Sequence, residues 1–88
     1  MSTEELVKRF KSFVDAHDLS GAKLFYEGVT ELEDVAWDYV YQKVYLHACL
    51  KKRHDFVKWM NELFEALEPL QRIALRQMFA YGRYLLQK

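Results

Sequence analysis

Three histidines and one cysteine are the side chains of this sequence that metal binding or nucleophilic catalysis would use first. His47 and Cys49 are two residues apart, so on a helix they point to different sides and cannot act as a pair. His17 and His54 are distant from them in the sequence, and the CxxC, HxxxH and HExxH spacings of metal sites do not occur. We therefore predict structural roles for these four residues, with no metal, no cofactor and no catalysis.

Acidic residues are concentrated in one short segment, where carboxylates could pair for acid–base chemistry. They are Glu31, Glu33, Asp34 and Asp38. The same positions fit the first turns of a helix, where the helix dipole favours negative charge. No glycine-rich loop that could hold a phosphate group occurs in the sequence. The acidic residues therefore indicate the start of a helix rather than an active site.

The last eighteen residues, QRIALRQMFAYGRYLLQK, combine arginine with aromatic and aliphatic side chains. Arg72, Arg76 and Arg83 are separated by four and seven residues, so a helix places them on one face, together with Phe79. Another face of this helix is expected to contact the core, and it consists of Ala74, Met78, Tyr81 and Leu85. Arginine and aromatic residues are enriched as anchors of protein interfaces. The pattern predicts that Arg72, Arg76, Phe79 and Arg83 contact a protein partner or another copy of the chain.

A nucleic-acid partner is the alternative for the arginine face. Nucleic-acid binding requires enough positive charge to neutralise the phosphate backbone and, ideally, an element that enters a groove. The segment Lys51–Arg53 could add charge, but the whole chain carries thirteen basic and thirteen acidic residues. The function that we expect is a non-catalytic interaction or regulatory module. The alternative is a small nucleic-acid-associated regulator that uses Arg72, Arg76 and Arg83.

Aromatic residues are numerous for a chain of 88 residues, with six Phe, six Tyr and two Trp. A domain of this size cannot easily surround so many rings, because small domains bury a smaller share of their surface. Some rings are therefore expected at a surface that meets a partner. We predict that Trp37, Tyr41 and Trp59 belong to that surface.

Composition limits the class of protein. Hydrophobic residues make up 51% of the sequence, with three glycines and one proline, which argues against a disordered chain and against an all-β fold. No apolar run is long enough for a membrane span or a signal peptide, and a single cysteine cannot form an intramolecular disulfide. We expect one all-α domain over residues 1–88, located in the cytoplasm and not in a membrane.

Charge is divided unevenly between the two halves of the chain. Residues 1–44 carry five basic and nine acidic groups, whereas residues 45–88 carry eight basic and four acidic groups. The resulting net charges of −4 and +4 suit head-to-tail association of copies, or the docking of an acidic partner on the C-terminal half.

The spacing of apolar residues predicts five helices, over about residues 3–16, 20–27, 31–52, 56–67 and 69–87. Capping boxes at Ser2–Glu5 and Thr30–Glu33 mark two of the starts, and Asp55 and Pro69 fit the starts of the last two. Gly28 is expected to end the second helix in a left-handed conformation. The third helix has apolar residues on two sides, which indicates neighbours on both. One continuous helix in place of the third and fourth is an alternative, because neither Gly nor Pro separates them.

Two short segments, His17-Asp18-Leu19 and His54-Asp55-Phe56, stand at comparable helix junctions and lie 37 residues apart. Small or apolar residues follow each of them at similar offsets, and the stretch HDLSGAKLFYEGVTEL resembles the second helix of a tetratricopeptide repeat. That family stacks helical pairs into solenoids whose grooves bind partners. The resemblance therefore implies a short two-hairpin solenoid with a protein-binding role. A compact up-and-down bundle is the alternative architecture.

Overall fold

Five α-helices and no strands make up the protein in a computed structural model that describes residues 1–88. The helices are α1 (Thr3–Asp15), α2 (Leu19–Val29), α3 (Trp37–Leu50), α4 (His54–Glu65) and α5 (Pro69–Gln87). The predicted all-α class is confirmed, and so is the number of helices.

Local signals set the starts of three helices. The backbone N–H of Glu5 donates to Ser2 Oγ at 3.1 Å, which is the first bond of the predicted capping box. The Glu5 carboxylate accepts at 3.2 Å from the Ser2 hydroxyl rather than from the Ser2 backbone N–H. Asp18 accepts from the backbone N–H of Gly21 at 2.9 Å and caps α2. Pro69 occupies the first turn of α5, as predicted, where its missing N–H leaves no hydrogen bond unmade.

The predicted start of the third helix is wrong, because α3 begins at Trp37 and residues 30–36 form turns. Two contacts hold this connection in a non-helical path. The backbone N–H of Ala36 donates to Thr3 Oγ1 of α1 at 3.1 Å, and Trp37 Nε1 donates to the carbonyl oxygen of Leu32 at 3.1 Å. The expected left-handed Gly28 is also wrong, since Gly28 lies within α2 and no glycine has a positive φ.

Helices α3 and α4 are separate, so the alternative of one continuous helix is wrong. Lys52 lies in the turn between them with a φ of 59°, and His17 lies between α1 and α2 with a φ of 57°. Asp55 was expected to cap the start of α4, but it lies in the first turn of the helix. The N-cap residue of α4 is Arg53. A left-handed residue thus ends the first helix of each pair without a glycine.

The two turns also have the same hydrogen bonds. The backbone N–H of Asp18 donates to the carbonyl oxygen of Phe13 at 3.0 Å, and that of Arg53 donates to the carbonyl oxygen of Ala48 at 2.9 Å. These bonds match the long bond of a Schellman motif. Equivalent residues lie 35 positions apart, which is two fewer than the spacing of the His-Asp segments. The resemblance to tetratricopeptide repeats stays a prediction.

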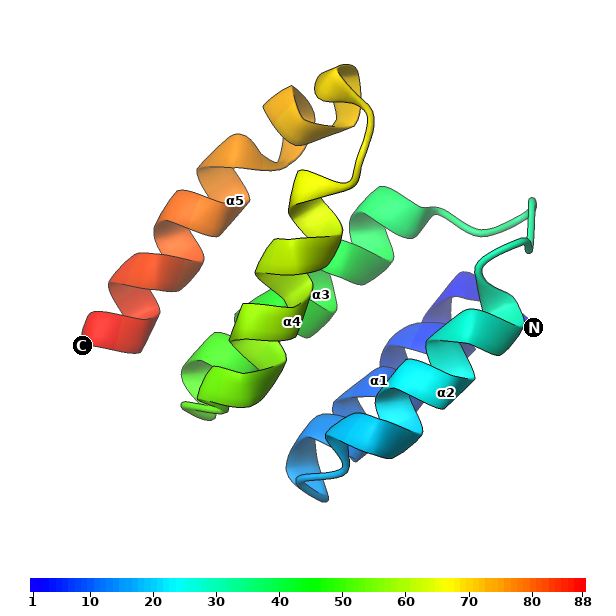
Figure 1. Cartoon of the computed structure of the whole chain (residues 1–88), viewed down its shortest axis with the longest axis horizontal. Helices are drawn as coiled ribbons and strands as arrows, with labels where there is room; N and C mark the ends of the chain where they lie inside the picture. The colour runs from blue at the N-terminus through cyan, green and yellow to red at the C-terminus, as the bar shows by residue number, and fades with distance from the viewer.

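The helices form two layers. Successive helices run in opposite directions, so α1, α3 and α5 run the same way (Figure 1). In this view α2 lies in front of α1, and α4 lies in front of α3. Helix α3 lies between α1 and α5 and packs against both. The molecule measures 34 × 32 × 19 Å, and its shortest dimension fits two layers of helices about 10 Å in diameter.

Helices α3 and α5 bury residues at equivalent positions. The four pairs, each 34 residues apart, are Tyr41 and Leu75, Val44 and Met78, Tyr45 and Phe79, and Ala48 and Gly82. A single core cluster of 19 buried residues joins the helices, with Tyr45 and Phe56 almost fully enclosed. The architecture is therefore two stacked helical pairs followed by α5, which repeats the position of α1 and α3.

Candidate protein-binding groove

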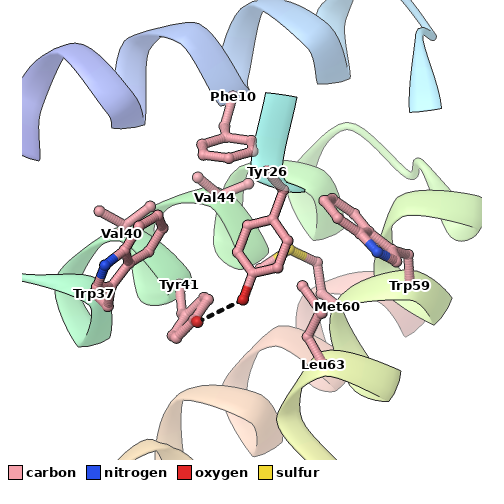
Figure 2. A pocket seen from close by; sticks show the side chains of 9 residues that line it. All are labelled: Phe10, Tyr26, Trp37, Val40, Tyr41, Val44, Trp59, Met60 and Leu63. Carbon is pink, nitrogen blue, oxygen red and sulfur yellow. Dashed lines mark hydrogen bonds between the residues drawn. The ribbon is translucent and has the colours of Figure 1, made fainter. Parts of the chain in front are cut away.

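The aromatic side chains that we predicted at a partner surface lie largely inside the protein. Tyr41 and Trp59 are buried, with Trp59 only 8% exposed, and Trp37 is half-buried. Figure 2 shows Tyr26 at the centre of this group. Its hydroxyl shares a hydrogen bond of 2.9 Å with that of Tyr41, and Trp37 and Trp59 each meet its ring edge-on at 5.8 Å. The prediction that these residues form an exposed partner surface is wrong, because the rings pack against one another.

The space between these rings is too small for a ligand. Nine hydrophobic residues line a cavity of about 10 Å³, which is no more than one water molecule requires. Burial, and then the hydrogen bond with Tyr26, raises the pKa of Tyr41 well above its ordinary value. The phenol is therefore less acidic than that of an ordinary tyrosine and is neutral at physiological pH. This aromatic group stabilises the junction between the two helical pairs.

Helix α5 turns a different face to the core from the one that we expected. Of the four residues predicted to contact the core, Met78 is buried, whereas Ala74 and Tyr81 are exposed. Phe79 was expected at the surface but is only 5% exposed, and its ring centroid lies 4.2 Å from that of Tyr45. Its ring nevertheless forms part of the floor of a surface groove.

Gly82 explains this orientation of α5. A Cβ atom at this position would overlap the ring of Tyr45 and lie 3.1 Å from Cys49 Sγ. Helix α5 therefore approaches α3 closely at its smallest residue. The buried face of α5 includes Gly82 and therefore differs from the expected face, which followed the apolar residues alone.

An open groove of about 420 Å³ runs along α5 beside the end of α4, and we call it the α4–α5 groove. Its seven lining residues are Phe64, Pro69, Arg72, Ile73, Arg76, Phe79 and Arg83. The structure thus brings together the three predicted arginines and Phe79. It adds Phe64 from α4, whose ring centroid lies 4.0 Å from that of Phe79, and Ile73, which is 68% exposed.

The arginines of the groove have no partners within the chain. Arg72, Arg76 and Arg83 are exposed, and none has a carboxylate oxygen within 4.0 Å or a side-chain hydrogen bond to another residue. The only ion pair of the chain joins His47 to Asp15. A guanidinium group can bind both oxygens of a carboxylate. The groove can therefore hold a segment with acidic side chains beside an apolar one.

The basic segment Lys51–Arg53 has mainly a structural role. Lys52 Nζ donates to the carbonyl oxygens of Leu85 and Leu86 at the end of α5. Arg53 Nε donates to the carbonyl oxygen of Val14 near the end of α1 at 3.2 Å. Cations are favoured at helix C-termini, where carbonyl groups lack backbone partners. Two of the three cations proposed to extend the arginine face therefore cap helices instead.

His47 and Cys49 are also accounted for by packing. His47 Nε2 lies 2.8 Å from Asp15 Oδ1 and joins α3 to α1. Cys49 is fully buried, and burial raises the pKa of its thiol.

No three His, Cys, Asp or Glu side chains gather into a site that could hold a metal ion. None of the helices combines the length and the apolar character that crossing a bilayer requires.

The contact between Asp15 and His47 makes stability depend on pH. Its hydrogen bond lowers the pKa of Asp15 below the ordinary value of 3.8, with the charges of His47, Lys51 and Arg53 acting in the same direction. A lowered pKa in the folded state stabilises the protein above pH 3.8, and this contribution is lost as pH falls through the folded value. We expect Asp15→Asn to lower the thermal unfolding midpoint at pH 7 and to lower it less as the pH falls toward about 2.

Thermal unfolding followed by circular dichroism tests this expectation, with Asp34→Asn as the control. Asp34 is exposed and has no hydrogen bond or ion pair, so its replacement should not reproduce the pH dependence. An equal loss of stability at both pH values in Asp15→Asn would show that the carboxylate charge is not involved.

No protein-family model matches this chain, and no curated protein or solved structure matches it.

Proposed function

We propose that this protein is a non-catalytic interaction module whose α4–α5 groove binds an acidic segment of a protein partner. The observation that carries this proposal is the gathering of three exposed arginines, none with a carboxylate nearby, around the rings of Phe64 and Phe79. A buried charge without a partner would be unfavourable, but these arginines are exposed to solvent and lie beside the apolar residues of the groove. That combination suits a partner with carboxylates around an apolar anchor.

Apolar residues in and beside the groove favour protein over nucleic acid. Ile73 lines the groove, and Leu70 lies about one helical turn before Ile73. Both side chains are largely exposed. Aliphatic side chains bury well against another apolar side chain, at about 25 cal/mol per Å² of area removed from water. A phosphate backbone offers no such surface, and three arginines neutralise few phosphates. The equal numbers of acidic and basic residues in the chain point in the same direction.

Site-specific photocrosslinking tests the proposal. We would replace Ile73 with p-benzoylphenylalanine and irradiate the protein in its native cells. We expect a discrete protein adduct that is lost when Arg72, Arg76 and Arg83 are changed to Glu, because reversed charge repels an acidic partner. The same photoreactive residue at Lys23, which is exposed on α2, serves as the control position. An adduct with nucleic acid, or a protein adduct that persists in the Arg→Glu variant, would contradict the proposal.

A further inference from the structure

We infer that the acidic segment bound by the α4–α5 groove is residues 30–36 of a second copy of this chain. This inference rests on the proposed function, because it names the occupant of the same groove. Residues 30–36 connect α2 to α3, and we call them the acidic loop. The loop contains three carboxylates, on Glu31, Glu33 and Asp34.

The acidic loop is open to a partner. Its three carboxylate residues are exposed, and none takes part in an ion pair or in a hydrogen bond. Leu32 lies between them and is 37% exposed, which provides an apolar side chain among the acids. The loop backbone is already held by the contacts of Ala36 with Thr3 and of Trp37 with Leu32. A segment held in place before binding loses less conformational entropy when it docks.

The groove and the loop match in number of charges and are opposite in sign. Three arginines face three carboxylates, and the halves of the chain that contain them have net charges of +4 and −4. Arg72 and Arg83 are eleven residues apart, which is about 16 Å along a helix. The loop forms turns between Val29 and Trp37 and is not extended, so its three carboxylates form a compact cluster that faces this row of arginines. Leu32 would then lie against Ile73 and Phe64 on the floor of the groove.

The loop of one copy cannot fill the groove of the same copy. Figure 1 shows the connection between α2 and α3 at one edge of the molecule, whereas α5 forms the opposite edge with α3 and α4 between them. Both the loop and the start of α5 lie at the end of the molecule where α3 begins (Figure 1). A second copy placed beside α5 in the same orientation would therefore present its loop at the level of the groove.

This contact joins two different surfaces, so each copy carries one loop and one groove. Such a heterologous interface propagates as an open chain unless rotation closes it into a ring. We expect the weight-average molar mass to rise continuously above 10.6 kDa as the concentration increases from about 10 μM to about 1 mM in 50 mM NaCl. High salt screens exposed charges, so 500 mM NaCl should return the protein to monomers.

Charge reversal on each side, followed by mixing, tests the inference. The groove variant carries Arg72→Glu, Arg76→Glu and Arg83→Glu, and the loop variant carries Glu31→Lys, Glu33→Lys and Asp34→Lys. Each variant alone should associate at least about 30-fold more weakly than the wild type, since like charges then face each other. An equimolar mixture should recover association, because the acidic groove of one variant meets the basic loop of the other. Light scattering after size exclusion measures all four samples.

The controls separate this interface from a general effect of charge. A third variant, with Lys8→Glu, Lys23→Glu and Lys58→Glu, has the same net charge as the groove variant but changes exposed residues outside the groove. It should associate like the wild type. Circular dichroism should show that all variants are folded, because the substituted side chains make no hydrogen bonds to other residues.

The outcomes distinguish failure of this inference from failure of the proposed function. A wild type that remains monomeric at about 1 mM in low salt overturns the inference, as does a mixture that fails to recover association. If the photocrosslink at position 73 then captures a different protein, and this adduct is lost in the Arg→Glu variant, the proposed function stands without self-association. If neither self-association nor an arginine-dependent protein adduct occurs, both are overturned. A crosslink between position 73 and the acidic loop of a second copy supports both.

Discussion

Replacing Trp59 with alanine is expected to lower the free energy of unfolding by about 3–5 kcal/mol. The indole ring is buried and meets Tyr26 and Phe56 edge-on, at centroid distances of 5.8 and 6.4 Å. Its removal leaves a void in the core that rigid neighbours cannot fill completely. Urea unfolding followed by far-ultraviolet circular dichroism measures the change, and Trp59→Phe, which keeps a ring, should lose much less.

Tyr84→Ala is the matched control for this substitution. The Tyr84 side chain is 59% exposed and stacks only on the exposed Tyr81. Its replacement should change stability by no more than about 0.5 kcal/mol. Equal stability of Trp59→Ala and the wild type would contradict the buried position of Trp59 and would return it to the candidate partner surface.

Gly82→Ala is expected to destabilise the protein by about 1–3 kcal/mol, as overpacking of a core typically does. The added methyl group would overlap the Tyr45 ring, which is fully buried and cannot move into solvent. Alanine favours helix over glycine by about 0.8–1.0 kcal/mol, so the clash must exceed this gain. Helix α5 should also separate partly from α3, which would expose Cys49 and increase its rate of reaction with a thiol reagent.

Gly28→Ala provides a matched comparison on another helix. Gly28 is exposed within α2, and a Cβ atom there would meet nothing within 4 Å. Only the helix-propensity gain remains, so this variant should be more stable than the wild type by up to about 1 kcal/mol. If Gly82→Ala unfolded at the same urea concentration as Gly28→Ala, the close approach of α5 to α3 would be disproved.

Local features of the fold were predictable from the sequence. The hydrogen bonds at Ser2 and the fixed φ of Pro69 act within one turn, so the starts of α1 and α5 were found correctly. The start of α3 was not found, because Thr30 and Glu33 imitate a capping box. The path of the connection is set instead by Thr3, which comes from a different helix.

The orientation of α5 depends on an approach between helices that the apolar pattern does not encode. Gly82 lies on the buried face of α5, where a Cβ atom would meet Tyr45 and Cys49 of α3. The aromatic content was misinterpreted for a related reason. Rings such as Tyr26 and Trp59 bury one another edge-on, so a small core held more of them than composition suggested.

The candidate site was predictable in part. Arg72, Arg76 and Arg83 share a helix face by their spacing alone, and the structure places them along one groove. Phe64 was not predictable as a member of the site, because it comes from α4, where its position in an apolar stripe indicated the core. Its contact with Phe79 creates the floor of the groove.

Identification of the molecule that crosslinks to a photoreactive residue at position 73 tests the central claim most directly. We predict a protein adduct whose crosslinked peptide is acidic and contains an apolar residue, and which disappears when the three groove arginines are changed to glutamate. A nucleic-acid adduct, or a protein adduct unaffected by the loss of these arginines, would contradict the account.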